Sequence, residues 1–272
     1  MSRLKEVYNA LVNFEKIKNN GAYPVHKKLL PFIIDNKQYL DINDWLLELN
    51  IHPNNQIADM GCGVGYTLMK LCSRFKCTGT GYSISENETT YATHLAEENN
   101  MEHACTFICH SFDNSISGKF DYVIAIESIK HCTNLNNTIT HIKNALKAGG
   151  KLILLDDWLL SHPENTKETA YLCKHWALQK LYTFDDIMLS LQESGLALTQ
   201  TYNLTQWIRP INTITLNIKT GVFKLLAFLH KNQEKKMLRT FSLLIFIMLV
   251  AISVSGQTKG WKKITNYDGV EV

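Results

Sequence analysis

The sequence predicts an α/β fold, with a doubly wound, mostly parallel, Rossmann-like sheet and helices on both faces. Three observations lead to this class. Between about residues 55 and 205, short β-rich runs alternate with longer runs whose apolar residues have helical spacing. Strand candidates such as residues 152–155 are apolar without interruption, which is typical of parallel strands covered on both sides. A glycine-rich turn at residues 61–65 joins the first strand of this region to its first helix.

The helices are predicted from apolar spacing and from signals at their ends. Leu68 and Cys72 fall on one face of the first helix. Ser85, with Glu88 three residues later, predicts a capping box at the start of the second. Gly195 is the expected stop of the fourth. The expected helices of the alternating region cover residues 66–75, 86–99, 134–146 and 183–194.

The strands lie between these helices. Ala148, Gly149 and Gly150 are expected to end the third helix, because glycine readily adopts the left-handed conformation of a helix end. The fifth strand then begins at Lys151, and a sixth follows Gly195. The expected strands cover residues 56–60, 78–83, 105–109, 122–126, 151–156 and 196–202.

The alternating region divides the chain into four expected parts. Residues 1–50 are predicted to be mainly helical, broken at residues 23–27, and to form an N-terminal cap. Residues 51–210 form the main domain, with a helical insertion after the fifth strand. Residues 211–236 are a C-terminal extension, and residues 237–272 are an apolar tail.

Composition and charge exclude several classes of protein. The chain is 45% hydrophobic and 19% charged, which is ordinary for a globular protein, and its net charge of +3 gives no reason to expect nucleic acid as a partner.

Seven cysteines, an odd number, are spread through expected core segments, so we expect no disulfide framework. Cys105, Cys109 and His110 have a spacing like that of metal ligands, but there is no second pair, so we expect buried thiols and no metal. The first twenty residues contain no apolar signal segment, so the expected compartment is the cytoplasm.

The turn after the first strand of the main domain is the clearest candidate binding motif. Gly61, Gly63 and Gly65 separate a strand from a helix, and Asp59 stands two residues before the first glycine. Glycines here let the backbone approach a ligand closely and direct amide N–H groups toward it. Dinucleotide-binding turns favour G-x-G-x-x-G over this G-x-G-x-G pattern, so a nicotinamide-dependent oxidoreductase is disfavoured. A glycine turn that serves only packing is the remaining alternative.

Four segments carry a resemblance to a known family. They cover residues 59–65, 79–87, 120–131 and 146–152. Together they resemble the class I S-adenosylmethionine-dependent methyltransferases, and within these the branch of cyclopropane-fatty-acid synthases, sterol C-methyltransferases and tocopherol O-methyltransferases. The resemblance extends from about Tyr23 to Pro210. It implies a Rossmann-like fold with S-adenosyl-L-methionine as the cofactor.

The resemblance also implies where the cofactor would be bound. Asp59 and the loop glycines would surround its methionine part. Ser83 and Ser85 lie where this branch holds the ribose, and Glu88 stands where the branch has a glutamine. Ser111 is the candidate near the adenine. The expected cofactor-binding residues are Tyr23, Asp59, Gly61, Gly63, Gly65, Ser83, Ser85, Glu88 and Ser111.

Residues outside the alternating core could complete the site. Tyr23 and His26 match the place where the resembling branch folds its N-terminal segment over the cofactor, and packing at a hinge is the alternative. Four aromatic residues in or beside the expected insertion could line an apolar pocket as a lid, or could simply belong to the core. They are Trp158, Trp176, Tyr182 and Trp207.

Glu127 and His131 are the candidate catalytic residues. They follow the fourth strand as E-x-x-x-H, and residues four apart share one face of a helical turn. The resemblance implies an acid beside the methyl-transfer centre, where a carboxylate acts as a general base or stabilises positive charge. The alternative is an acid that interacts with a helix dipole and a histidine that is hydrogen-bonded in the wall.

The function that this resemblance implies is methyl transfer to carbon or oxygen of a small, apolar acceptor. The expected reaction is direct displacement, in which the protein mainly positions the two reactants. Lipids, isoprenoids, sterols and phenols or quinols all remain open as acceptors. The alternative is a non-catalytic binding or regulatory protein of the same fold, which the departures at Glu88 and near the adenine slightly favour and the intact glycine turn disfavours.

The tail has a pattern that the resembling family does not explain. A stretch that begins at Phe241 and ends at Gly256 has no charged residue, and its sixteen residues are fewer than the roughly 20 that span a membrane. A preceding Met237 and a basic residue make it similar to a bacterial signal peptide. We interpret the tail as a neighbouring reading frame joined to the domain. A membrane anchor is the second interpretation, and a buried helix the third.

Overall fold

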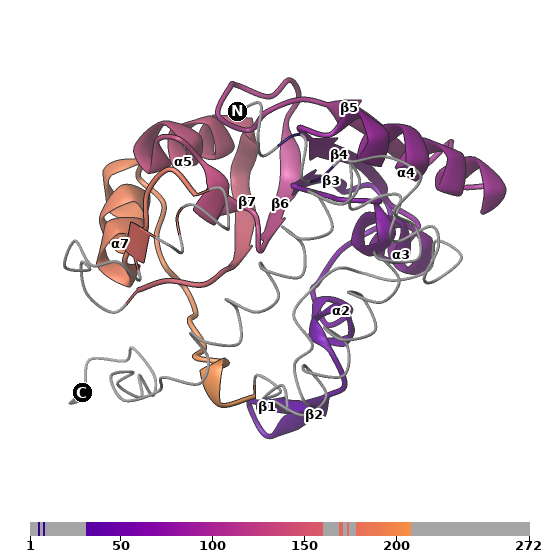
Figure 1. The fold of residues 1–272 in the computed structure, drawn as a ribbon. Coiled ribbons are helices and arrows are strands. Elements are labelled where there is room, and N and C mark those ends of the chain that lie inside the picture. The colour runs from indigo at the N-terminus through magenta and orange to yellow at the C-terminus, as the bar shows by residue number, and fades with distance from the viewer. Residues whose placement is uncertain are drawn as a thin grey trace, which may run out of the picture.

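The computed structural model describes residues 31–159 and 178–207, together with Lys5, Tyr8, residues 169–170 and Cys173. Its centre is a sheet of five parallel strands in the order β5-β4-β3-β6-β7 (Figure 1). The strands are β3 (Gln56–Met60), β4 (Thr78–Ser83), β5 (Cys105–Cys109), β6 (Phe120–Ile126) and β7 (Leu146–Leu155). The chain builds outward from β3 to β5 and then returns to β6 on the other side of β3. The fold is therefore the α/β class that the sequence predicts, with a switch point between β3 and β6.

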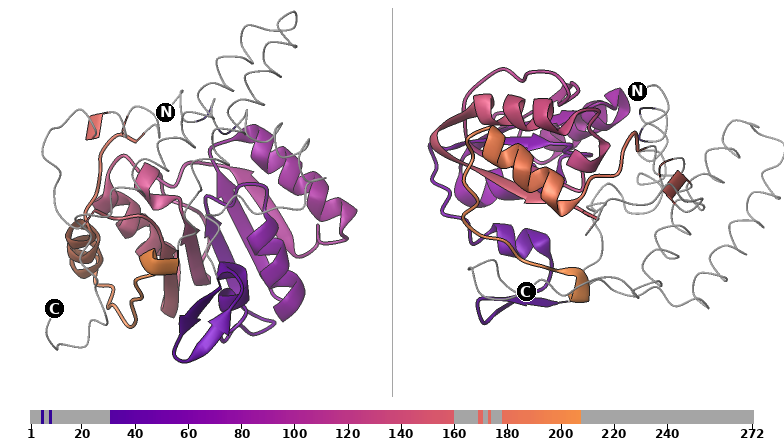
Figure 2. Two further views of the ribbon diagram at one scale, coloured as in Figure 1. Left: turned by 60° about the horizontal axis from the view of Figure 1, so that its bottom comes forward. Right: turned by 90° about the vertical axis from the view of Figure 1, so that its left-hand side faces the viewer.

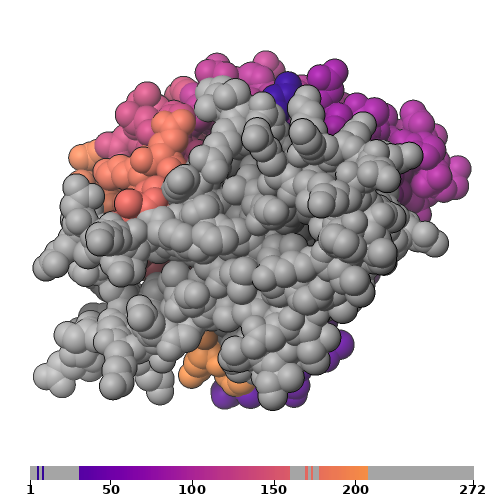
Figure 3. Space-filling model, viewed as in Figure 1, coloured from indigo at the N-terminus to yellow at the C-terminus, as the bar shows by residue number. Residues whose placement is uncertain are grey.

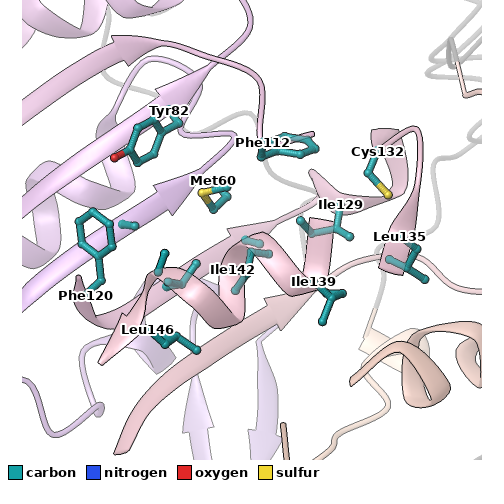
Figure 4. Packing of buried hydrophobic residues seen from close by; sticks show 14 of the residues in the cluster. Met60, Tyr82, Phe112, Phe120, Ile129, Cys132, Leu135, Ile139, Ile142 and Leu146 are labelled. Carbon is teal, nitrogen blue, oxygen red and sulfur yellow. The ribbon is translucent and has the colours of Figure 1, made fainter. Parts of the chain in front are cut away.

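Helices cover both faces of this sheet. On one face, α3 (Tyr66–Phe75) buries Leu68 and Leu71 against strand residues such as Ile57 and Ile124. On the other face, α5 (Leu135–Ala145) packs against the sheet and against α7 (Phe184–Glu193). Figure 4 shows residues of this second cluster gathered between α5 and the strands. In the space-filling view, α4 (Glu86–Glu98) forms the described surface on one side, and α5 and α7 form it on the other (Figure 3).

Most element bounds agree with the sequence, but the start of β7 does not. The expected glycine end of the third helix is wrong, because α5 already ends at Ala145 and Leu146 is extended. Gly149 does adopt a positive φ of +74°, but it lies inside β7. The register between β6 and β7 shifts between Phe120 and Tyr122. The glycines therefore belong to an irregular strand start and not to a helix cap.

The sixth strand expected at residues 196–202 is not formed. Gly195, with φ of +74°, ends α7 as expected, and the following residues form neither helix nor strand. They cross instead to the N-terminal part of the described chain, where the Tyr202 hydroxyl donates a hydrogen bond to Asp35 Oδ2 at 2.9 Å. Tyr202, Leu204 and Trp207 are partly buried against the hairpin without joining a sheet.

Residues 31–50 are not mainly helical as expected. They form a hairpin of β1 (Phe32–Ile34) and β2 (Lys37–Tyr39), followed by the single-turn helix α2 (Ile42–Leu46). Asp35 and Asn36, with φ of 49° and 62°, make the two-residue left-handed turn that matches the twist of a hairpin. The hairpin is separate from the five-stranded sheet (Figure 2).

The expected aromatic lid is only partly described. Tyr182 is buried in the cluster that packs against α5, Trp158 is partly buried against the same cluster, and Trp207 is partly buried against the β1–β2 hairpin. Trp176, Tyr23 and His26 lie outside the described residues, as does the uncharged stretch between Phe241 and Gly256. Among the helices that the structure describes, none has the length and apolar character needed to cross a membrane.

Candidate active site

The carboxyl ends of the parallel strands meet at one edge of the sheet, on either side of the switch point. Asp59 lies near the end of β3, and Ser83 ends β4. Glu127 directly follows β6, and Asp156 directly follows β7. Open α/β sheets bind ligands at this edge. Most of the predicted site residues that the structure describes are therefore brought to one place.

The glycine turn is bound to the end of β4. The backbone N–H groups of Gly61 and Cys62 both donate to the Tyr82 carbonyl oxygen, at 2.8 and 3.0 Å. Gly65, with φ of +79°, is the N-cap of α3. The turn between Gly61 and Gly65 is thus fixed at both ends, and its middle residue is Gly63.

The three glycines of this turn have different surroundings. A Cβ on Gly61 would lie 2.5 Å from the Cβ of Ser128, and a Cβ on Gly65 would overlap the Phe107 ring. Among the described residues, a Cβ on Gly63 would meet nothing within 4 Å, and the φ of Gly63 is +53°. Gly61 and Gly65 are therefore required by close packing. At Gly63 the turn borders open space, which is where a ligand could approach the backbone.

Asp59 is a buried acid beside this turn. It is 4% exposed, and burial raises the pKa of its carboxyl group to about 7. Burial disfavours the charged form of this carboxyl group, so a donor or a cation next to Asp59 would stabilise its carboxylate.

Ser83, Ser85 and Glu88 form one buried network where β4 passes into α4. The Ser83 hydroxyl donates to Glu88 Oε2 at 2.5 Å and accepts from the Ser85 N–H at 3.0 Å. Ser85 Oγ accepts from the Glu88 N–H at 3.1 Å, which is the N-cap bond of α4. Of the two bonds of the expected capping box, this one is direct. In place of the second, Ser83 Oγ bonds both the Glu88 carboxyl and the Ser85 N–H. Burial raises the pKa of Glu88 to about 7, although the bond from Ser83 acts in the opposite direction.

Ser111 lies just past the last backbone bond between β4 and β5. His110 N–H donates to the Ser83 carbonyl at 2.8 Å, and Ser111 Oγ accepts from the Asp113 N–H at 3.2 Å. Asp113 itself accepts from the Thr133 N–H at 2.8 Å, so it is bound to the loop before α5. Ser111 is therefore nearer than Asp113 to the end of β5.

Glu127 and His131 do not share a face of one helical turn, so the arrangement predicted from the E-x-x-x-H spacing is wrong. Glu127 has a φ of +52°, and its N–H donates to the Leu155 carbonyl at 2.7 Å. Only Ile129–His131 is helical, as a short 3₁₀ turn. A non-glycine residue at positive φ is strained, and such residues gather at functional sites.

The His131 imidazole is buried and uncharged at neutral pH. Burial and the nearby Lys130 charge lower its pKa to about 3. Its Nε2 lies 3.2 Å from the Tyr8 hydroxyl, and within the described part of the chain its Nδ1 is buried without a partner. At neutral pH, His131 can therefore accept or donate a hydrogen bond but cannot supply an imidazolium proton.

Four further polar residues lie at this edge and are not among the residues predicted from the sequence. Lys130 Nζ lies 3.0 Å from Asp156 Oδ1 and 3.4 Å from Asp157 Oδ2. Two acids directly after an apolar strand were a usable signal for Asp156 and Asp157, whereas nothing in the local pattern marked Tyr8. Burial raises the pKa of the Tyr8 hydroxyl, so this side chain stays protonated.

No metal centre is found among the described residues, where no group of three or more His, Cys, Asp or Glu could hold an ion. Cys105 is buried, while Cys109 is exposed and its thiol donates to the Ile84 carbonyl at 3.6 Å.

The fold and this edge define a known class of proteins. A family model described as a methyltransferase domain matches residues 51–238, which is more than half of the chain. The chain belongs to this family of methyltransferase domains.

Curated relatives and solved structures are similar to the chain at low identity. A sterol 24-C-methyltransferase of Schizosaccharomyces pombe is 28% identical over 134 residues, which cover 45% of this chain and 34% of the relative. The 27-O-demethylrifamycin SV methyltransferase of Amycolatopsis mediterranei is 24% identical over 169 residues, covering 60% of this chain and 61% of the relative. The chain thus spans about one third to three fifths of the length of these relatives.

One solved structure is a geranyl diphosphate C-methyltransferase of Streptomyces coelicolor in complex with Mg²⁺, geranyl diphosphate and S-adenosyl-L-homocysteine. It has a TM-score of 0.61 and 15% identity, covering 88% of this chain and 92% of that one. The structure of the [4+2]-cyclase SpnF has a TM-score of 0.71 and 15% identity, and the match covers 93% of this chain and 89% of that one. At this identity the structures establish the shared fold.

Proposed function

We propose that this chain is an S-adenosylmethionine-dependent methyltransferase that acts on carbon or oxygen of a small, apolar acceptor. The observation that carries the proposal is the combination of a glycine turn that is open at Gly63, among the described residues, with the buried carboxyl of Asp59 on the strand before it. The fold opens this space at the carboxyl edge of the sheet, and the chain belongs to a methyltransferase family. Curated relatives that methylate sterols and a rifamycin support a small, largely apolar acceptor.

The residues of this edge fit the proposed cofactor. Asp59 would accept hydrogen bonds from the cationic amino group of its methionine part, with the backbone of Gly61, Gly63 and Gly65 alongside. A cationic partner would relieve the unfavourable burial of the Asp59 carboxylate.

The other half of the cofactor would lie over the ends of β4 and β5. Glu88 is positioned by Ser83 and Ser85, and its carboxylate would accept from the ribose hydroxyls. Ser111 would lie at the adenine. Tyr23, which is outside the described residues, stays a predicted contact on the N-terminal side.

The reacting centre would lie beside Glu127. The cofactor supplies an activated methyl group on a sulfonium cation, and the protein holds the acceptor in line with it. The Glu127 carboxylate would take a proton from the acceptor or stabilise positive charge that develops on it. His131 would contribute as an uncharged hydrogen-bonding group, because its pKa of about 3 keeps it neutral.

Calorimetry of the purified chain tests the cofactor assignment. We expect binding of S-adenosylmethionine and S-adenosylhomocysteine and no binding of NAD. Asp59→Ala should weaken S-adenosylhomocysteine binding at least about tenfold, since it removes a buried hydrogen-bonding charge. Glu98→Ala, at an exposed position of α4, is the control and should bind normally. Unchanged affinity in a folded Asp59→Ala chain would remove Asp59 from the site.

A labelled-methyl assay tests the activity itself. The acceptors to offer are a sterol, an unsaturated fatty acyl lipid and a quinol. Glu127→Gln should lose at least about 100-fold in turnover and keep its affinity for S-adenosylhomocysteine, because the proposed role concerns the acceptor. Near-normal turnover would show that Glu127 is structural. Cofactor binding without transfer to any acceptor would favour the non-catalytic alternative.

A further inference from the structure

Asp113 connects two loops that leave the sheet from different strands. It lies in the bend after β5, and its Oδ1 accepts from the Thr133 N–H at 2.8 Å. Thr133 follows residues 127–132, here called the Glu127 turn, which carries both candidate catalytic residues. In the sheet order, β4 and β3 stand between β5 and β6. Strand pairing therefore does not account for the contact between Asp113 and Thr133.

The bend that holds Asp113 also packs against the Glu127 turn. Ser111 Oγ accepts from the Asp113 N–H at 3.2 Å, so Ser111 and Asp113 are fixed to one another. Between them, Phe112 is buried in the same cluster as Ile129 and Cys132 of the Glu127 turn (Figure 4). Close-packed side chains transmit a displacement of one loop to the other.

Thr133 is held at both of its backbone polar groups. Asp113 accepts from its N–H, and the Tyr182 hydroxyl donates to its carbonyl oxygen at 3.4 Å. Thr138 of α5 donates to the same Asp113 oxygen, also at 3.4 Å. The bond between Asp113 and the Thr133 N–H is the shortest of the three, and it lies at an exposed position. Because water can replace a bond at such a position, its loss should leave the fold intact.

The end of the Glu127 turn depends on this bond more than its start does. The end of β7 holds the start through the Glu127 N–H at 2.7 Å, and Asp156 holds the middle through the Lys130 N–H at 3.0 Å. Further along, the N–H groups of His131 and Cys132 donate to carbonyls of the turn itself, at 3.0 and 2.9 Å. The bonds of a short 3₁₀ turn have poor geometry. The backbone at this end is therefore held to other elements through the residue that follows it.

We propose that Asp113 is a positioning residue through which the bound cofactor holds the Glu127 turn in place. The inference rests on the proposed function, in which the adenine lies at Ser111, two residues before Asp113. A cofactor that fixes Ser111 also fixes the Asp113 carboxylate, and this carboxylate holds the Thr133 N–H at the end of the turn. The end that carries His131 is then firmly held when the cofactor is bound and less firmly held when it is absent.

Two substitutions separate the hydrogen bond from the charge of Asp113. Asp113→Ala removes the acceptor, whereas Asp113→Asn keeps an oxygen that can accept from the Thr133 N–H. The matched control is Asp121→Ala at the opposite edge of the sheet. There Asp121 Oδ2 accepts the backbone N–H of Gln56 at 2.7 Å, so the control removes a carboxylate with the same kind of bond away from the site.

Hydrogen exchange of single backbone amides, followed by NMR, measures how firmly the turn is held. The reporters are the N–H groups of His131 and Cys132, because neither is bonded to Asp113. Saturating S-adenosylhomocysteine should slow their exchange at least about tenfold in the unaltered chain, in Asp113→Asn and in Asp121→Ala. In Asp113→Ala the slowing should be less than about threefold. Amides of β3 and β4 in the same spectra show whether each variant is folded.

Equal slowing in Asp113→Ala and in the unaltered chain would overturn the proposal. So would unchanged exchange at both amides when the unaltered chain has bound S-adenosylhomocysteine, or loss of the slowing in Asp113→Asn, which keeps the acceptor. If S-adenosylhomocysteine does not bind the unaltered chain, the proposed function fails. The ligand-free chains then still test whether Asp113 holds the turn: exchange at His131 and Cys132 should be at least about threefold faster in Asp113→Ala than in Asp121→Ala. Equal rates would show that it does not.

Discussion

At the scale of single residues, the candidate site is unusual for the acids it buries. Asp59 lies near the end of β3 and Glu88 lies in the first turn of α4, and burial raises the pKa of each to about 7. Glu88 has a hydrogen bond from Ser83, whereas burial alone sets the shift of Asp59. An acid whose pKa is raised on folding opposes the folded state when it ionises. The chain without a ligand therefore becomes less stable at the pH where these acids become charged.

Asp59→Asn should stabilise the chain in a pH-dependent way. The folded pKa of about 7 is above the ordinary 3.8, so the destabilisation by Asp59 begins near pH 4 and is complete above pH 7. The gain from Asp59→Asn should reach up to about 4 kcal/mol at pH 8 and roughly half of that or less at pH 5. Urea unfolding of both chains at the two pH values measures it. A variant that is less stable than the unaltered chain at pH 8 would contradict the burial argument.

At the scale of elements, the sequence predicts best where the signal is local and repeated. The bounds of β3, β4 and β5 agree with prediction, because each is a short run between helical patterns with clear ends. The run after Gly195 is compatible with a strand in composition, yet it crosses to the hairpin, which no local pattern indicates. The hairpin was missed because Asp35-Asn36 lacks the glycine of the commonest two-residue turns.

The residues of the candidate site also differ in whether a local pattern in the sequence could predict them. Asp59 and the glycine turn form a contiguous motif that can be read from a single segment. The contact of Lys130 with Asp156 joins residues 26 positions apart, and the contact of Tyr8 with His131 joins residues 123 apart. These pairings depend on strand order and on the path of the N-terminal segment, so spacing in the sequence could not predict them.

Two alanine substitutions in the glycine turn should separate folding from binding. Gly63→Ala places its Cβ in open space, and the left-handed backbone costs about 1–2 kcal/mol. Its Tm should fall modestly, while its affinity for S-adenosylhomocysteine falls at least about tenfold. Gly65→Ala overlaps the Phe107 ring in addition to its strained φ and should lower the Tm much further.

Thermal unfolding and calorimetry of both variants provide the comparison. Gly65→Ala combined with Phe107→Ala is the matched control, since removal of the ring relieves the overlap and should recover part of the Tm. Normal cofactor binding by Gly63→Ala would mean that the open space beside this turn is not the ligand site.

At the scale of the whole molecule, the N-terminal hairpin and α2 are tied to the glycine-turn helix. Asn43 of α2 accepts a buried hydrogen bond from the Thr67 hydroxyl at 2.9 Å, in the first turn of α3. Asp44 and Lys70 form a second link at 3.5 Å. The apolar side of the hairpin is covered by Tyr202, Leu204 and Trp207, and by Leu155 at the end of β7. The described core is therefore closed by residues up to position 207.

A chain that ends at Lys236 should keep its stability and its cofactor affinity. The buried clusters use described residues between 32 and 207, and the family match ends at residue 238. We expect a Tm within about 2 °C of the full chain, which corresponds to less than about 1 kcal/mol. Differential scanning calorimetry with and without S-adenosylhomocysteine measures both properties. Unfolding or loss of binding on truncation would make the tail an integral part of the domain.

The bond between Tyr202 and Asp35 joins residues 167 positions apart and has a consequence for biosynthesis. The ribosome releases the hairpin long before it releases the segment that covers it. At about 5–20 residues per second, roughly 10–30 seconds separate the two events. During that interval Phe32, Ile34 and Tyr39 have no C-terminal cover, while the strands from β3 to β7 are synthesised one after another. The nascent chain therefore carries a temporary apolar surface at its N-terminal end, which a chaperone can occupy until residue 207 emerges.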